Sequence, residues 1–328
     1  MANSTSATRL FRDAGLLGFI VVLSAVVQVL NPSFLTLENL ADMAKNTAIL
    51  SILSVGMMLV IITRGIDLSI GATLALSGML AASTVARWGD TPPLVAIALG
   101  MAIGLVCGSI VGLLVARGRV LPIIASLGLM NIFRGVTYLV SDGKWISANQ
   151  MPASFKGIAL ASFLGVNALV WIALLVNVLA WWFLTWSRMG RQVYAVGSNP
   201  ESARVSGIDI ERTLYWVYAL MGALSGLAGV LWVAKFASAQ GDTAMGFELS
   251  VIAACVLGGV SIAGGSGKIS GIVMGTLLLG ILNNALPLIN VSPFWQTFIQ
   301  GSIILAAVMI NALVKRRAMR KTMRKRRI

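Results

Sequence analysis

The residues whose types could do chemistry most directly lie in GGSGKIS, residues 264–270, which has glycines, a lysine and a serine close together. A phosphate-binding loop needs the pattern G-x-x-x-x-G-K-[ST] between a strand and a helix. Here Ile262 stands at the first glycine position and Ile269 at the hydroxyl position, and apolar runs flank the stretch. We interpret it as a tight turn between two membrane segments and expect no nucleotide to bind this chain.

Other familiar catalytic groups are scarce. The chain contains no histidine, which argues against histidine-ligated metals, haem and histidine general bases. Its two cysteines, Cys107 and Cys255, lie in apolar runs without CxxC spacing, as small buried residues do. The lack of histidine removes most enzyme chemistries, and we expect the chain to bind no metal or cofactor of its own.

The stretch RGIDLSIG, residues 64–71, places Arg64 and Asp67 at the cytoplasmic mouth of a predicted membrane helix. An acidic residue at a membrane helix is a candidate functional residue. The simpler interpretation is that Asp67 caps the start of that helix, with Arg64 as its partner and with Gly71 allowing close packing. Arg64, Asp67 and Gly71 are thus candidates for a structural or gating role.

A second group of polar residues lies inside predicted membrane helices, where such side chains face protein or water and not lipid. Two interpretations are open: a neutral polar path for a hydroxylated solute, or hydrogen bonds between helices. The residues that could line such a translocation path are Asn131, Arg134, Asn283, Asn284 and Gln300.

The elements that must position these residues are membrane helices. Of the 328 residues, 58% are hydrophobic and 11% charged, and mean hydropathy is +0.89, whereas soluble domains average roughly 25% charged residues. We predict an all-α polytopic membrane protein forming a single domain, residues 1–328, with about ten transmembrane helices. The expected spans are 14–30, 47–63, 68–86, 93–115, 120–140, 166–186, 213–234, 248–264, 269–286 and 294–314.

The distribution of positive charge predicts the orientation of these helices. If both termini are cytoplasmic, 19 of the 25 Lys and Arg residues lie on the cytoplasmic side and five outside, with Arg134 inside a span. The N-terminal segment 1–13 and the polybasic tail 315–328 are then cytoplasmic, and the tail lies against anionic lipid headgroups. This explains the net charge of +14 without nucleic acid as a partner.

An even number of spans with both ends inside permits two inverted five-helix halves, as in many transporters. Two similarities favour such a repeat. GLVCGSIVG (104–112) resembles GKISGIVMG (267–275), and DLS (67–69) resembles ELS (248–250).

The central cytoplasmic segment 187–212 carries signals for a short helix over about 200–206. Ser198 or Asn199 suits the N-cap, Pro200 the first helical position and Glu201 the positive end of the helix. Gly207 suits the position after the C-cap. So short a helix is unstable alone and must pack on something, either on this protein's own helices or on a separate cytoplasmic protein.

The residues of this helix carry a resemblance to a known family. Glu201, Ser202, Ala203 and Gly207 form a pattern similar to the E-A-A-x-x-x-G cytoplasmic loop of bacterial ABC importer permeases. Three longer stretches, 56–71, 195–209 and 237–286, resemble the ribose-type sugar permeases (the ribose, xylose and arabinose permease family) across nearly the whole chain. That family usually has Ser or Gly before GIDLS, so Arg64 departs from its form.

The resemblance implies a multi-pass permease subunit of the bacterial inner membrane that translocates a monosaccharide, such as a pentose or a hexose. It implies several partners: cytoplasmic ABC ATPase subunits that bind ATP–Mg, a periplasmic sugar-binding protein, and a second permease copy or paralogue. It also implies that the helix at 200–207 couples to the ATPase. The coupling residues would be Asn199, Pro200, Glu201, Ser202, Ala203, Arg204 and Gly207.

Two other classes fit the charges less well. An ion-coupled secondary transporter of a small polar solute needs ionisable groups deep in the membrane, and apart from Arg134 the charges are expected at span ends. An intramembrane aspartyl protease needs two facing aspartates, and GIDLS supplies one.

Overall fold

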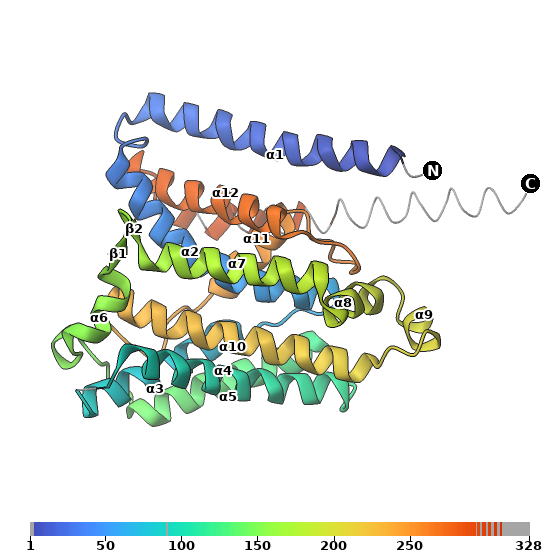
Figure 1. The fold of residues 1–328 in the computed structure, drawn as a ribbon. Coiled ribbons are helices and arrows are strands. Elements are labelled where there is room, and N and C mark those ends of the chain that lie inside the picture. The colour runs from blue at the N-terminus through green and yellow to red at the C-terminus, as the bar shows by residue number, and fades with distance from the viewer. Residues whose placement is uncertain are drawn as a thin grey trace, which may run out of the picture.

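The computed structural model describes residues 3–89, 91–292 and, beyond these, 294–295, 297–299, 301–302, 305–306 and 309. Most of the predicted span 294–314, Gln300 and the tail 315–328 lie outside the described residues. The chain folds into a bundle of long helices (Figure 1). The helices that form the bundle are α1 (Asn3–Leu30), α2 (Leu37–Ile62), α3 (Ile70–Arg87), α4 (Pro93–Ala116), α5 (Pro122–Ser141), α7 (Ala168–Trp186), α10 (Ile210–Phe236), α11 (Phe247–Leu257) and α12 (Ile269–Leu288).

Smaller elements lie at the two ends of this bundle. At one end are the 3-10 helix η1 (Ala148–Gln150), α6 (Ala153–Leu160) and a hairpin of β1 (Ser162–Phe163) and β2 (Val166–Asn167). At the other end are α8 (Arg188–Ser198) and α9 (Pro200–Val205), with α9 farthest from the bundle (Figure 1).

Seven of the described helices are long and apolar enough to cross a membrane, namely α2, α3, α4, α5, α7, α10 and α12. Two shorter apolar helices, Gly15–Leu30 within α1 and α11, accompany them. This confirms the all-α polytopic class. The predicted span 248–264 is wrong in length, because the helix ends at Leu257 and residues 258–268 are non-helical. The glycine pairs 258–259 and 264–265 break it, since glycine is a poor helix former.

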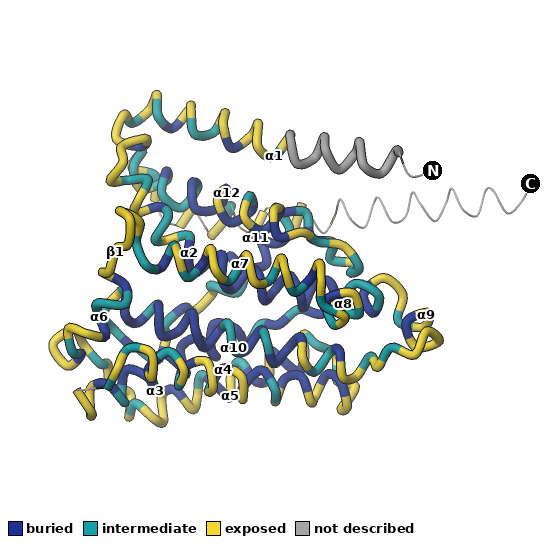
Figure 2. Tube along the Cα trace, viewed as in Figure 1, coloured by how far each residue is buried: buried dark blue, intermediate teal, exposed yellow. Residues whose placement is uncertain are grey.

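The core is centred on α10 and α2. In their most apolar windows 78% and 83% of residues are buried, against 22% in α7, and Figure 2 shows the same contrast between inner and outer helices. The exposed surface of the outer helices is rich in Leu, Val, Ile and Trp. An apolar outer surface with every helical backbone group satisfied is what a lipid environment requires.

The chain between α2 and α3, residues 63–69, is not helical and enters the interior of the bundle. Gly65 packs against the phenol oxygen of Tyr218, and Gly108, well inside α4, packs against the carbonyl oxygen of Tyr218. The segment therefore reaches the level of the central part of α4, and α3 starts within the bundle. Gly71, in the first turn of α3, faces the carbonyl of Ala244 and the carboxylate of Glu248 at the start of α11.

Candidate functional site

The short helix α9 forms where its capping residues predict. The side chain of Asn199 is the N-cap acceptor, 3.2 Å from the amide nitrogen of Ser202, and Pro200 occupies the first turn. At the other end Gly207 has φ 77°, a left-handed conformation that favours glycine. The amides of Gly207 and Ile208 donate to the carbonyls of Arg204 and Ala203, both at 3.0 Å. This is a Schellman motif, so both ends of α9 are fixed.

The surface of α9 is open on most sides. Ala203 is buried, whereas Glu201, Ser202, Arg204 and Val205 are exposed. Val205, the last residue of α9, is 89% exposed, a high value for a branched apolar side chain. The helix α9 itself projects from the bundle (Figure 2).

The helix before it, α8, was not predicted from the sequence. Its N-cap is Ser187, whose hydroxyl accepts from the amide of Gly190 at 2.8 Å. Its buried positions are Gly190, Val193, Val196 and Gly197. These small and apolar residues are spaced three or four apart, which is a sequence signal for a helix with one buried face. The charged residues around them obscured this signal.

Backbone and side-chain contacts attach α8 and α9 to the rest of the protein through Ile62, Arg64, Gly197, Ser198 and Gly265, which we call the Arg64 junction. The guanidinium of Arg64 donates from Nε to the carbonyl of Gly197 at 2.7 Å and from Nη2 to that of Ser198 at 2.6 Å. The amide of Gly265 donates to the carbonyl of Ile62 at 2.8 Å. A Cβ atom at residue 197 would lie 1.7 Å from the carbonyl oxygen of Ile62, so only glycine fits.

Tyr194 of α8 adds a further contact beside the junction. Its hydroxyl donates to the carbonyl of Gly267 at 2.9 Å, and burial raises the pKa of the Tyr194 phenol. A phenol is protonated at physiological pH even at its ordinary pKa, so the hydroxyl donates this bond there and burial extends the range to higher pH. The GGSGKIS stretch is confirmed as a turn, and its backbone serves as a surface on which α8 rests.

The structure separates Arg64 from Asp67. Asp67 is only 2% exposed, and its Oδ1 accepts from the amide and the hydroxyl of Ser69 at 2.9 and 2.6 Å. The carboxylate thus closes the turn before α3. The expectation that Asp67 caps the helix itself was wrong, because the N-cap of α3 is Ser69, whose side chain makes no capping bond. The prediction that Asp67 lies at the cytoplasmic mouth of the helix and pairs with Arg64 was wrong. Residues 63–69 carry Asp67 into the bundle, whereas the side chain of Arg64 bonds to the last two residues of α8.

The polar residues predicted for a translocation path fall into two separate groups. On α5, Arg134 donates from Nη1 to the carbonyls of Gly241 and Thr243, both at 2.8 Å, and Asn131 is exposed and donates to Leu127 of its own helix.

The second group lies on α12, which packs against α2. The amides of Asn284 and Asn39 bond reciprocally at 2.8 and 2.9 Å, while Asn283 lines a small cavity nearby. The structure therefore does not bring Asn131 and Arg134 together with Asn283 and Asn284, and Gln300 lies outside the described residues.

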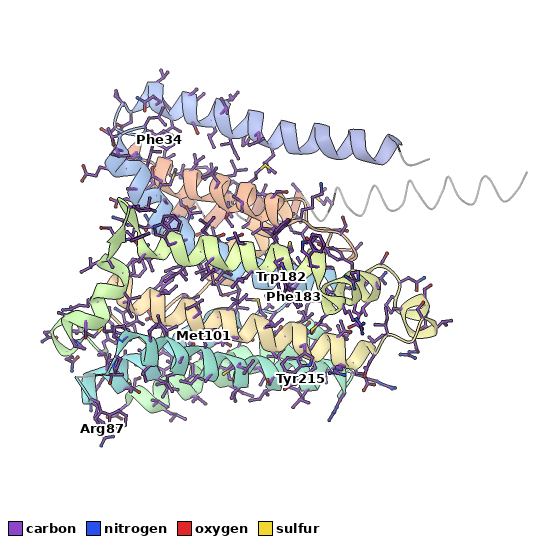
Figure 3. All side chains as sticks on the ribbon, viewed as in Figure 1. Phe34, Arg87, Met101, Trp182, Phe183 and Tyr215 are labelled. Carbon is purple, nitrogen blue, oxygen red and sulfur yellow. The ribbon has the colours of Figure 1, made fainter. Side chains whose placement is uncertain are left out.

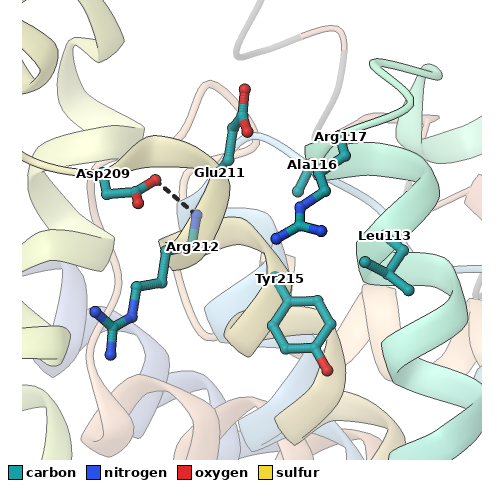
Figure 4. A pocket seen from close by; sticks show the side chains of 7 residues that line it. All are labelled: Leu113, Ala116, Arg117, Asp209, Glu211, Arg212 and Tyr215. Atoms are coloured by element: carbon teal, nitrogen blue, oxygen red, sulfur yellow. Dashed lines mark hydrogen bonds between the residues drawn. The ribbon is translucent and has the colours of Figure 1, made fainter.

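A polar cavity of about 480 Å³ lies beside the start of α10, at the end of the bundle that carries α9. Charged side chains from the ends of α4 and α10 surround it (Figure 4). Asp209 caps α10 here by accepting from the amide of Arg212 at 2.9 Å. The residues that line the cavity are Leu113, Ala116, Arg117, Asp209, Glu211, Arg212 and Tyr215.

Comparisons with known proteins agree with this picture of a membrane transporter. Residues 39–308 match the family described as branched-chain amino acid transport system / permease component. The ribose import permease protein RbsC of Escherichia coli K12 is 42% identical over 89% of this chain and 91% of its own length. The same-named protein of Bacillus subtilis 168 is 40% identical over 88% and 89%, respectively. The D-allose transport system permease protein AlsC of E. coli K12 is 35% identical over 90% of each chain. No solved structure matches the chain.

Proposed function

The chain belongs to the branched-chain amino acid transport system / permease component family, and from that premise we propose that it is the membrane-spanning subunit of an ABC importer for a monosaccharide. The relatives favour a sugar over an amino acid, because relatives 42% and 35% identical to this chain are named as ribose and D-allose permeases. A pentose, a hexose or a related sugar is the expected cargo.

As a permease subunit the chain is not an enzyme. ATP–Mg is expected on a separate cytoplasmic ATPase, and the sugar is expected to arrive on a periplasmic binding protein. A second permease, either a copy of this chain or a paralogue, would complete the pore. The expected location is the bacterial inner membrane.

We assign the coupling role to α9, with Asn199, Pro200, Glu201, Ser202, Ala203, Arg204 and Gly207 as its residues. A coupling element must be rigid and must present a surface to the partner. The two caps and the exposed Glu201, Arg204 and Val205 meet both needs. The observation that carries the proposal is the bonding of Arg64 to Gly197 and Ser198, because it connects α9 to the segment that leads into α3.

The inverted arrangement of two five-helix halves is also proposed. It is supported by the starts of α3 and α11, which approach each other where Gly71 faces the carbonyl of Ala244 and the carboxylate of Glu248. The similar tripeptides lie near these starts, DLS (67–69) just before α3 and ELS (248–250) in the first turn of α11. In this arrangement α9 and both termini are cytoplasmic. Arg87, at the end of the bundle opposite Tyr215 and α9, is then periplasmic (Figure 3).

The test is sugar uptake by the reconstituted importer, with the ATPase and the binding protein present. Glu201→Lys reverses the charge on the docking surface, and Gly207→Pro forbids the left-handed conformation that ends α9. Both variants should insert normally and should lower uptake at least about tenfold, which corresponds to roughly 1.4 kcal/mol of lost coupling.

Matched controls separate coupling from folding. Glu38→Lys makes the same charge change at an exposed site at the start of α2, and Gly143→Pro strains another left-handed glycine, φ 66°, at the opposite end of the bundle. Both controls should still co-purify with the ATPase, whereas Glu201→Lys should not. Wild-type uptake by Glu201→Lys or Gly207→Pro would disprove the coupling assignment.

A further inference from the structure

A small cavity lies where α2, α10, α11 and α12 meet, near the end of α10 that is farther from α9. Its volume is about 220 Å³, which is room for about seven water molecules and suits a ligand of monosaccharide size. The side chains that line it and that the argument uses are Asn46, Thr47, Trp232, Lys235, Phe247 and Asn283.

One polar atom of this lining lacks a partner. The amide oxygen of Asn283 is buried, and among the described residues nothing donates a hydrogen bond to it. Leaving a buried acceptor without a hydrogen-bond donor is destabilising. The neighbouring Asn284 is, by contrast, fully engaged with Asn39. A donor such as a hydroxyl group would satisfy the amide oxygen of Asn283.

The cavity also presents hydrogen-bond donors. The ammonium of Lys235 donates to Oδ1 of Asn46 and lies 4.8 Å from the centre of the Phe236 ring. An ammonium has three N–H groups and the amide of Asn46 has two, so both side chains can donate further bonds. Acceptors and donors close together, without a carboxylate among the described residues that line this first cavity, suit a neutral ligand with several hydroxyls. The carboxylate of an adjoining cavity, Asp242, is a further acceptor for hydroxyls.

Aromatic rings complete the surface. Trp232 packs edge-on against Phe247 with ring centres 5.1 Å apart, and against Phe236 at 5.0 Å. A second cavity of about 330 Å³ shares Trp232 and Phe236 with the first. It is lined by the loop residues Ser238, Gln240, Asp242, Thr243 and Ala244. Apolar walls with a few placed polar groups are the usual make-up of a small-molecule site.

We propose that these two adjoining cavities form a monosaccharide subsite on the permease itself, with Trp232 as the wall that the sugar ring packs against. The amide oxygen of Asn283 accepts from one sugar hydroxyl, and Lys235 and Asn46 donate to others. The inference rests on the proposed function, since a sugar must cross this chain, and it adds where the sugar is held in the periplasmic half.

Cysteine protection tests the binding directly in the reconstituted importer. Cys107 and Cys255 are both buried, so an introduced cysteine is labelled over a low background. Millimolar D-ribose or D-allose should slow methanethiosulfonate labelling of Asn46→Cys at least threefold. The control Leu164→Cys, at an exposed site in the β1–β2 hairpin turn outside both cavities, should react at the same rate with and without sugar. Equal rates at both sites would overturn the subsite.

Uptake distinguishes failure of the subsite from failure of the function. Trp232→Ala and Asn283→Leu should lower uptake of the same sugars at least tenfold, while stimulation of ATP hydrolysis by the binding protein persists. Trp216→Ala, on the same helix outside both cavities, should transport normally. If the wild type imports no member of a panel of pentoses and hexoses that includes D-ribose and D-allose, the proposed function and the subsite both fail. If the wild type imports any of them and the two cavity variants match it, only the subsite fails.

Discussion

At the scale of single residues, Arg64 has an unusual backbone conformation, and its side chain makes two hydrogen bonds to backbone carbonyls. Its φ of 68° is left-handed, which costs a residue with a side chain about 1–2 kcal/mol. Each hydrogen bond from a charged donor contributes about 1.5–3 kcal/mol when shielded and less when exposed. The guanidinium is partly exposed, so the two effects are of similar size. The contact therefore adds little net stability, and we infer that its value is positional.

Removal of the Arg64 side chain should consequently uncouple transport more than it destabilises the protein. We expect Arg64→Met to lower sugar uptake per ATP hydrolysed at least about fivefold, with insertion and ATPase binding retained. Uptake and phosphate release measured in the same proteoliposomes give this ratio. Arg64→Lys, which can donate to one carbonyl at a time, should fall between Arg64→Met and the wild type.

The exposed Arg188 at the start of α8 provides the matched control. Arg188→Met removes the same charge from the same segment without touching the junction, and it should keep the wild-type ratio of uptake to hydrolysis. An unchanged ratio in Arg64→Met would show that the junction does not transmit motion.

At the scale of elements, the central contact of the bundle is the packing of α4 on α10. A Cβ atom at Gly104 would lie 2.1 Å from the carbonyl oxygen of Gly222, and one at Gly222 would lie equally close to the carbonyl of Gly104. Glycines four residues apart on both helices, at 100, 104 and 108 and at 222 and 226, let the two backbones touch. Close backbone approach is how membrane helices gain packing energy without a hydrophobic driving force.

Gly104→Leu should therefore separate α4 from α10. Overpacking in a dense core costs typically 1–3 kcal/mol and more when backbone atoms must move, so we expect a clear drop in the thermal unfolding midpoint in detergent, or loss of the folded protein. Gly128→Leu is the control, since a Cβ atom at Gly128 meets nothing within 4 Å. Equal unfolding midpoints for the two variants would contradict the packing role.

At the scale of the whole molecule, the two ends of the bundle differ in composition and in contacts. One end carries α8, α9 and the Arg64 junction, and the other carries α6 and the β1–β2 hairpin (Figure 1). The seven candidate spans connect these ends. The proposed importer needs two different ends, because its ATPase would dock on the cytoplasmic face of the membrane and its sugar-binding protein on the periplasmic face.

Labelling of single cysteines from the two sides of the membrane tests the polarity. Val205, at the tip of α9, and Leu164, in the hairpin turn, are 89% and 79% exposed. In intact cells an impermeant maleimide should label Leu164→Cys and not Val205→Cys, and it should label both after lysis. The opposite pattern would reverse the proposed orientation.

At the same scale, we expect the isolated permease to have no ATPase activity. The purified permease should hydrolyse no ATP above the background of empty detergent micelles, and hydrolysis should appear when the partner ATPase is added. Release of phosphate from ATP by a homogeneous sample of this chain would contradict the assignment as a non-catalytic subunit.

Several features of the candidate site followed from the sequence, because local residues dictate them. Asn199, Pro200 and Gly207 specify a short capped helix through their own backbone and side-chain preferences. The apolar runs specify membrane helices, since no other structure satisfies the backbone in lipid without an open edge. The failed phosphate-loop pattern at 264–270 correctly predicted a turn.

The contacts between segments that are distant in the sequence became known only from the tertiary structure. That Arg64 bonds to Gly197 and not to Asp67 depends on two chain segments 133 residues apart, and the depth of Asp67 depends on where residues 63–69 meet α10. The separation of Asn131 and Arg134 from Asn283 and Asn284, and the cavity at Trp232, likewise depend on which helices are neighbours. Hydrophobic periodicity determines that helices form, whereas their neighbours are chosen by packing between distant surfaces, and a single sequence does not display that packing.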